Sequence, residues 1–286
     1  DAITAALHLP RQAGSGFVFL DTERGNVKRI SVTDFAGAVN EDTTVINVEA
    51  KDRLIAAFCT DGSSEVMLIT NSGQSIRFAE EDVRSMGLAA GGVAGIKLGK
   101  DEKVIYATRV DPKGNLLTIT TQGFAKQTEI RDYSSQGRNG GGIVTHKVTA
   151  KIGDVAAALL ISPDQQQGTV MVLISKNNPT AVPLAEVPIQ GRGVQGKQIA
   201  PISVGSEVVG ITMVQMPSDG NGAPSSTEEE PKAVDKTKAP AAASNNGKST
   251  TKPVEASKPI AAGMTQAPVK AAAQTPAKEA ERTVKA

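Results

Sequence analysis

An internal repeat constrains the fold of this sequence more than any other feature. Four turn-forming residues, Gly25, Gly73, Gly123 and Asn177, recur at intervals of roughly 50 residues. A short run of β-branched, aromatic or other apolar residues precedes each of them, at 17–20, 66–69, 116–119 and 170–174. Such runs, followed by a residue that readily adopts positive φ, are typical of β-hairpins.

Further positions recur behind each of these turns. An acid follows the second expected strand of each repeat, at Asp34, Asp82, Asp132 and Glu186. A glycine-rich loop comes next in repeats two to four. In every repeat a second acid then precedes another apolar run, at 54–58, 104–106, 155–161 and 208–211. We therefore expect each repeat to read strand, turn, strand, glycine-rich loop, strand, acidic turn and strand, which is the size of a propeller-like blade.

The repeat predicts an all-β domain over residues 1–216, with about four four-stranded blades. Within that range only residues 80–86 show a pattern that could form a single helical turn. Residues 1–7 match the last strand of a repeat, so we expect the chain to begin with the end of a preceding blade.

Composition changes sharply after this domain. Residues 217–286 consist largely of Ala, Pro, Lys, Ser and Thr and hold no aromatic residue, so we expect a disordered low-complexity tail. The formal net charge of the whole chain is +1, and charge alone therefore indicates no nucleic-acid partner. The single cysteine, Cys59, can form no internal disulfide, which favours a reducing compartment. No apolar run is long enough to predict a membrane span.

Three motifs resemble those of a known family. Residues 72–87 read SGQSIRFAEEDVRSMG, residues 92–98 read GVAGIKL, and residues 136–142 read QGRNGGG. They are similar to the loops of the C-terminal domain of the DNA gyrase A subunit, and the resemblance continues in register through residues 1–216. It implies a β-pinwheel, which is a propeller-like array of four-stranded blades.

The resemblance also implies a function. The domain of that family binds double-stranded DNA without sequence specificity and wraps it along a basic rim, which supports ATP-dependent negative supercoiling by the whole enzyme. Its partners are the gyrase A catalytic domain and the gyrase B subunit in an A2B2 heterotetramer. The resemblance therefore implies a module that is non-catalytic by itself, holds no cofactor or metal, and works in the bacterial cytoplasm at the nucleoid.

Two departures from the family pattern affect these expectations. The hallmark first-blade box, Gln-Arg-Arg-Gly-Gly-Lys-Gly, does not appear in this sequence, so we expect an N-terminally truncated member of the family. Where the family often has arginines in one loop, this chain has Leu88, Gly91 and Ala94. We therefore expect weaker DNA wrapping than in a typical member.

Wrapping without base reading requires cations at regular spacing and backbone amides that can approach phosphates. Candidates recur at similar offsets in the repeats. The predicted DNA-binding set is Lys28, Arg29, Arg77, Arg84, Lys97, Lys126, Arg138, Gly140, Gly142, Lys147, Arg192 and Lys197. Two alternatives stay open for these residues: each cation could be an ordinary exposed charge, and the glycines could serve the turns alone.

Other site types have less support in the sequence. Asp34, Asp82 and Asp132 have no second recurring ligand beside them, so we expect turn caps rather than metal ligands. The two histidines, His8 and His146, lack the recurring partners of a catalytic triad. Because the net charge is low, the alternative function is a pinwheel scaffold, or protein-interaction domain, with weakened DNA affinity.

Overall fold

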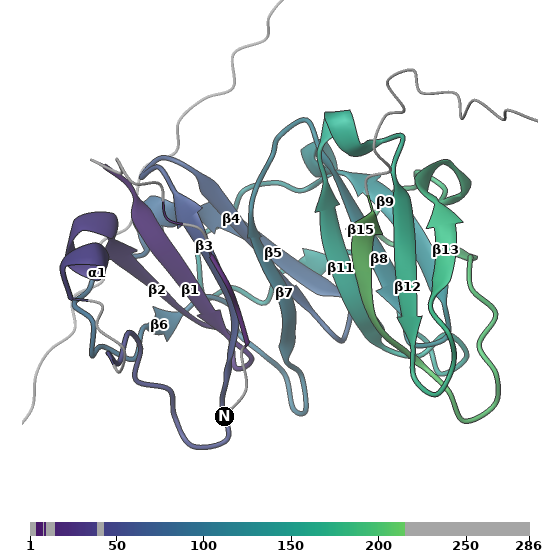
Figure 1. Cartoon of the computed structure of the whole chain (residues 1–286), viewed down its shortest axis with the longest axis horizontal. Helices are drawn as coiled ribbons and strands as arrows, with labels where there is room; N and C mark the ends of the chain where they lie inside the picture. The colour runs from purple at the N-terminus through teal and green to yellow at the C-terminus, as the bar shows by residue number, and fades with distance from the viewer. Residues whose placement is uncertain (1–3, 8, 10–14, 39–42, 215–286) are drawn as a thin grey trace, which may run out of the picture. The chain divides into compact units, whose positions relative to one another are not determined.

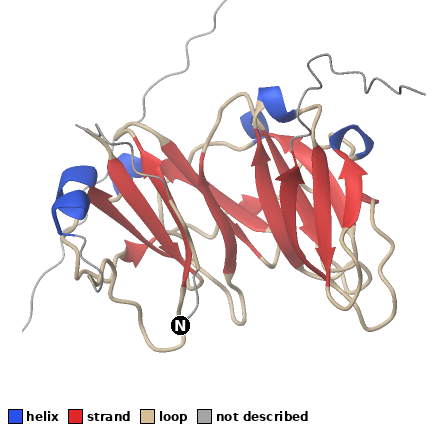
Figure 2. Ribbon diagram, viewed as in Figure 1, coloured by secondary structure: helices blue, strands red, loops and turns tan. Residues whose placement is uncertain are grey.

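The computed structural model describes residues 4–7, 9, 15–38 and 43–214 (Figure 1). Their strands form four antiparallel sheets, connected by loops and short helices (Figure 2), which confirms the all-β fold. The expected tail, residues 217–286, lies outside the described residues.

The four sheets follow one another along the chain. In each, the strand order starts at the inner strand, which contacts the inner strand of a neighbouring sheet. The first contains β3 (Leu54–Thr60), β1 (Phe17–Thr22), β2 (Asn26–Ser31) and β6 (Val93–Ala94). The second contains β7 (Val104–Arg109), β4 (Glu65–Thr70), β5 (Gln74–Ala79) and β10 (Ile143–Val144). The third contains β11 (Val155–Ile161), β8 (Asn115–Thr120), β9 (Phe124–Glu129) and β14 (Lys197–Gln198). The fourth contains β15 (Val208–Val214), β12 (Thr169–Ile174) and β13 (Thr180–Pro183).

Hairpins join β1 to β2, β4 to β5, β8 to β9 and, in the three-stranded fourth sheet, β12 to β13. In the first three sheets Gly25, Gly73 and Gly123 take φ values of 74°, 80° and 77°, as the turn chemistry predicts. In the fourth sheet the residue with positive φ is Lys176, at 62°. Asn177 is not among the described residues with positive φ. The prediction that Asn177 takes the place of the hairpin glycine in this turn is therefore wrong.

The outer strand of a sheet comes from the next repeat. β6, β10 and β14 belong to the glycine-rich loops of repeats two, three and four, yet they pair with β2, β5 and β9 of the repeat before. The glycine before each short strand has positive φ, and an added Cβ would lie 2.7, 2.5 or 2.4 Å from a carbonyl oxygen of the partner strand. The repeat pattern predicted these strands but not this exchange between repeats.

Apolar clusters fill the spaces between neighbouring sheets. One cluster joins Phe19 of the first sheet to Leu68 and Phe78 of the second, and similar clusters join the second to the third and the third to the fourth. The inner strands β3, β7, β11 and β15 also contact one another in sequence. A fourth cluster covers the other face of the first sheet.

Local structure departs from the expectations at three places. A short helix that was not predicted, α1 (Val32–Ala38), follows β2, and the Ser31 hydroxyl accepts the Asp34 amide hydrogen bond at 3.1 Å. The expected turn at 80–86 is a 3-10 helix, η1 (Glu80–Asp82). Equivalent turns occur at η2 (Ile130–Asp132) and η4 (Leu184–Glu186), and η3 (Pro163–Gln165) follows β11.

The third departure is at the N-terminus. Residues 4–7 form no strand, so the predicted end of a preceding blade is absent from the described residues in this range. Leu7 and Leu9 instead pack against the cluster of Val18, Leu20 and Ile30 on the first sheet.

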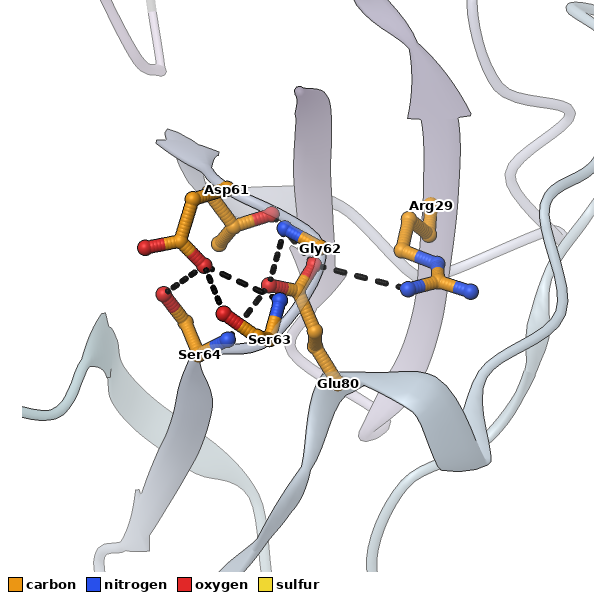
Figure 3. A network of polar contacts seen from close by, with 7 residues as sticks. Arg29, Asp61, Gly62, Ser63, Ser64 and Glu80 are labelled. Atoms are coloured by element: carbon orange, nitrogen blue, oxygen red, sulfur yellow. Dashed lines mark hydrogen bonds and ion pairs between the residues drawn. The ribbon is translucent and has the colours of Figure 1, made fainter. Parts of the chain in front are cut away.

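A buried carboxylate, Glu80, fixes the turn between the first and second sheets (Figure 3). Its Oε1 accepts hydrogen bonds from the amides of Gly62 and Ser64, at 2.8 and 2.9 Å. Its Oε2 accepts one from the Thr60 hydroxyl at 2.5 Å and lies 3.6 Å from Nη1 of Arg29. These contacts satisfy the charge of Glu80 inside the protein.

Replacing Glu80 with Gln is expected to destabilise the domain by roughly 1–3 kcal/mol, because the amide NH2 would face buried donors. The exposed neighbour Glu81 is the matched control. Urea denaturation followed by circular dichroism measures both variants. Equal midpoints for Glu80→Gln and Glu81→Gln would contradict the structural role.

Gly142 and Gly137 provide a second matched pair, because they lie in the same loop. An added Cβ at Gly142, where φ is 73°, would lie 2.5 Å from the Ser75 carbonyl oxygen, whereas nothing lies within 4 Å of one at Gly137. We expect Gly142→Ala to cost at least about 1 kcal/mol and Gly137→Ala less than about 0.5 kcal/mol. The midpoints of urea denaturation measure this difference. Equal midpoints for the two variants would show that the loop adjusts to the added Cβ and would contradict the prediction.

Candidate nucleic-acid interface

Three glycine-rich loops, residues 84–97, 134–147 and 188–198, form the outer edges of the first three sheets, and we call them the rim loops. Near its start, each rim loop is held to the preceding repeat by one backbone hydrogen bond. The Met86 amide donates to the Arg29 carbonyl at 2.9 Å, the Gln136 amide to the Arg77 carbonyl at 2.7 Å, and the Gln190 amide to the Gln127 carbonyl at 2.8 Å. Because the three hydrogen bonds are equivalent, the loops dock in the same way.

Backbone hydrogen bonds also connect one rim loop to the next. The Lys97 amide donates to the Gly140 carbonyl at 2.9 Å, and the Lys147 amide donates to the Val194 carbonyl at 3.1 Å. The Asn139 amide donates to the Gly95 carbonyl at 2.6 Å. The rim loops are therefore one connected line of backbone.

Each rim loop carries two predicted cations that reach solvent. Arg84, Lys97, Lys147 and Lys197 are exposed, and Arg138 and Arg192 are half-buried. Lys97 and Lys147 occupy equivalent places, whereas Lys197 lies earlier in its loop, on β14. The six side chains thus form three pairs along the connected backbone.

Arg138 and Arg192 also hold the rim loops together. Nε of Arg138 donates to the Asp82 carbonyl at 2.9 Å, and Nη1 donates to the Ala94 carbonyl at 3.0 Å. Nη1 of Arg192 donates to the equivalent carbonyl of Val144 at 3.4 Å. A guanidinium has five N–H donors, so both side chains keep donors for a phosphate.

The structure removes Lys28 and Lys126 from the predicted contact set, because both are completely buried. Nζ of Lys28 donates to the carbonyls of Val45, Leu88 and Ala90, and Nζ of Lys126 donates to the Thr128 hydroxyl. Burial lowers the pKa of each lysine to about 8. Neither ammonium group can reach a phosphate in this conformation.

Arg29 and Arg77 also make internal contacts, which fasten one repeat to the next. Nη1 of Arg77 donates to the carbonyls of Ile130 and Tyr133, at 3.1 and 2.9 Å, and its guanidinium pairs with Glu65. The Arg29 guanidinium lies 4.2 Å above the Phe17 ring, beside Glu80.

Sequence reasoning missed the third member of this set, Gln127. Its Nε2 donates to the carbonyls of Leu184 and Val187, at 3.2 and 3.1 Å, which are the equivalents of the Arg77 contacts. A signal was available: the position holds Arg, Arg and Gln in three repeats, and an uncharged amide favours internal hydrogen bonds over phosphate contacts.

The two predicted glycines have structural roles in the rim loops. The Gly142 backbone approaches Ser75, and the Gly140 carbonyl accepts the link from Lys97. Leu88 stands where Arg138 stands in the next repeat, and it packs against the cluster on the first sheet. An arginine at position 88 would therefore lose that packing.

Acids accompany the cations of the rim. Asp82, Asp132 and Glu186 are exposed at the ends of η1, η2 and η4, just before each rim loop. Asp34 is exposed in α1. In the described part of the chain, no cluster of three His, Cys, Asp or Glu residues could hold a metal ion.

His146 is a structural residue. Its Nδ1 lies 2.9 Å from the Thr118 hydroxyl and its Nε2 lies 2.9 Å from the Gln195 carbonyl. Burial, with Lys126 nearby, lowers the pKa of His146 to about 4, so the ring is neutral at physiological pH. His8 lies outside the described residues.

Comparisons with known proteins bear on the fold. The structure superposes on the C-terminal domain of DNA topoisomerase IV with a TM-score of 0.63 and 18% identity, covering 70% of this chain and 62% of that one. It superposes on the DNA gyrase A C-terminal domain with a TM-score of 0.61 and 22% identity, covering 70% of this chain and 66% of that one. These similarities confirm the fold predicted from the resemblance. No helix among the described residues is long and apolar enough to cross a membrane.

Sequence comparisons bear on the family. The chain is 32% identical over 219 residues to the DNA gyrase A protein of Salmonella typhimurium, covering 77% of this chain and 25% of the relative. It is 33% identical over 206 residues to the Pseudomonas aeruginosa protein, covering 72% and 22%. It thus spans about a quarter of the length of these relatives. The family profile described as "DNA gyrase C-terminal domain, beta-propeller" matches residues 17–38, 64–111, 114–162 and 182–215. The chain therefore belongs to the DNA gyrase A C-terminal domain family.

Proposed function

We propose that this chain is a DNA-binding and DNA-wrapping module that holds duplex DNA along its three rim loops without reading its sequence. The observation that carries the proposal is the recurrence of two solvent-facing cations on each of three equivalently docked loops. Cations on successive loops suit the repeated phosphates of a duplex, and phosphate contacts carry no sequence information.

The refined contact set contains Arg84, Lys97, Arg138, Lys147, Arg192 and Lys197. It excludes four predicted cations that serve internal contacts, and this supports the expectation of modest affinity. Arg138 and Arg192 link DNA contact to loop position, because the same guanidinium fixes a neighbouring rim loop.

Family membership supports the wider role. We propose that the module acts with a gyrase A catalytic domain and the gyrase B subunit, in an A2B2 heterotetramer of the bacterial cytoplasm and nucleoid. In that assembly it would wrap DNA for ATP-dependent supercoiling, while contributing no catalytic residue or cofactor of its own.

A pinwheel scaffold, or protein-interaction domain, is the second candidate. It is favoured by the exposed acids before each rim loop and by the internal use of Lys28, Arg29, Arg77 and Lys126. A folded protein that fails to bind linear duplex at low salt would support this alternative.

The salt dependence of DNA binding separates the two candidates. We expect the triple variant Lys97→Gln, Lys147→Gln, Lys197→Gln to bind linear duplex more weakly, with a slope of log K against log salt reduced by up to about 2.7, or about 0.9 per lost phosphate contact. Fluorescence anisotropy over a salt series measures this slope.

The control replaces Lys113, Lys151 and Lys176, which are exposed outside the rim loops, with Gln. It changes net charge by the same amount, so we expect a slope close to that of the unchanged protein. Equal losses in both triple variants would show that binding follows net charge and would contradict the rim assignment.

A further inference from the structure

One buried carboxyl is unexplained by the fold or by the proposed function. Asp21 lies on β1, on the same face as Phe19, which packs between the first and second sheets. It is completely buried. The equivalent positions of the next two repeats hold Ile69 and Ile119, which are also buried. The first repeat therefore has an acid where its neighbours have an apolar side chain.

This carboxyl lacks the partners that a buried charge requires. Neither Oδ1 nor Oδ2 of Asp21 accepts a hydrogen bond of normal geometry, and the nearby Thr22 amide offsets its burial only in part. Asp52 precedes β3, and its Oδ2 is also buried without a partner. Its Oδ1 accepts the amides of Arg24 and Arg53, at 2.9 and 2.8 Å. Asp52 is half-buried and lies close enough for its charge to act on Asp21.

The charged groups of the surrounding turns do not neutralise the pair. Glu23 takes both nearby cations, because its Oε1 lies 3.1 Å from Nη2 of Arg53 and 3.2 Å from Nζ of Lys103. Arg24, the remaining charged residue of the β1–β2 turn, is exposed, and its amide rather than its guanidinium contacts Asp52.

We propose that Asp21 and Asp52 form a proton-binding site, and that loss of the proton loosens the packing of the first sheet on the second. A proton fits the site better than a divalent metal ion does. Such ions take six or more oxygen ligands, whereas the pair offers three unpartnered oxygens. A buried carboxyl group next to a second carboxyl group cannot ionise at low cost.

The site has a defined direction of pH dependence. Burial, followed by the charge of Asp52, raises the pKa of Asp21 well above its ordinary value. In the unfolded chain the pKa returns to about 3.9. Above that pH the unfolded chain releases a proton that the folded protein retains, so stability falls as pH rises until the folded pKa is reached.

Denaturation of the full chain at a series of pH values tests the proposal. In the unchanged protein, we expect the titration of Asp21 to raise the unfolding equilibrium constant by up to about tenfold per pH unit above pH 4. Asp21→Asn and Asp21→Ile should lack this contribution. Asp21→Ile restores the residue type of the equivalent repeats, so we also expect a higher midpoint at neutral pH. His146 and Lys126 titrate equally in all variants, and the difference between profiles isolates Asp21.

The control is Asp164→Asn, at an exposed aspartate of η3, and we expect it to keep the profile of the unchanged protein. The rate of amide hydrogen exchange, corrected for its intrinsic pH dependence, should rise with pH in β3 and β7 of the unchanged protein. In Asp21→Ile the corrected rate should stay level. Parallel profiles for the unchanged protein and Asp21→Ile would overturn the proposal. It would also be overturned if magnesium or calcium raised the midpoint of the unchanged protein but not of Asp21→Ile.

Discussion

Backbone pairing between consecutive repeats is the interaction on which the rest of this structure depends. A hairpin alone leaves its outer strand unpaired, and a strand of two residues has almost no stability by itself. The exchange solves both problems, because the rim loop of one repeat closes the sheet of the repeat before it. Glycines with positive φ permit the close approach at each of the three joints.

Several polar side chains near these joints serve the joints themselves. Arg77 and Gln127 reach the 3-10 turn of the following repeat, and Lys28 ties the 88–90 segment to the first sheet. A cation that is buried for this purpose offsets its desolvation with several hydrogen bonds and has none left for a phosphate. The six cations of the refined contact set lie on the rim loops, where Arg138 and Arg192 also hold neighbouring loops together.

The repeated pattern of the sequence was sufficient to predict the fold. Strands, hairpin glycines and four blades follow from positions such as Gly25, Gly73 and Gly123, which recur with constant neighbours. The exchange of β6, β10 and β14 could not be predicted in this way, because a repeat pattern shows where strands occur but not which repeat they pair with. Helix α1 was also missed, because the first repeat departs from the pattern there.

The candidate site was less predictable than the fold, and for a physical reason. Lysine and arginine have the same appearance in a sequence whether they face solvent or carbonyl groups. Lys28 and Lys126 share their position with the buried Ile76, which is a signal of burial that the sequence reasoning missed. Arg84, Lys97 and Lys147, by contrast, are exposed.

Lysine labelling with and without duplex DNA tests the central claim directly, because it reports on every described lysine in one experiment. The full chain is treated with an acylating reagent in low salt, and mass spectrometry measures the extent of labelling at each site. DNA should protect Lys97, Lys147 and Lys197 and leave Lys113, Lys151 and Lys176 unchanged, while Lys28 and Lys126 stay unreactive throughout. Protection of the second group but not the first would contradict DNA binding along the rim loops.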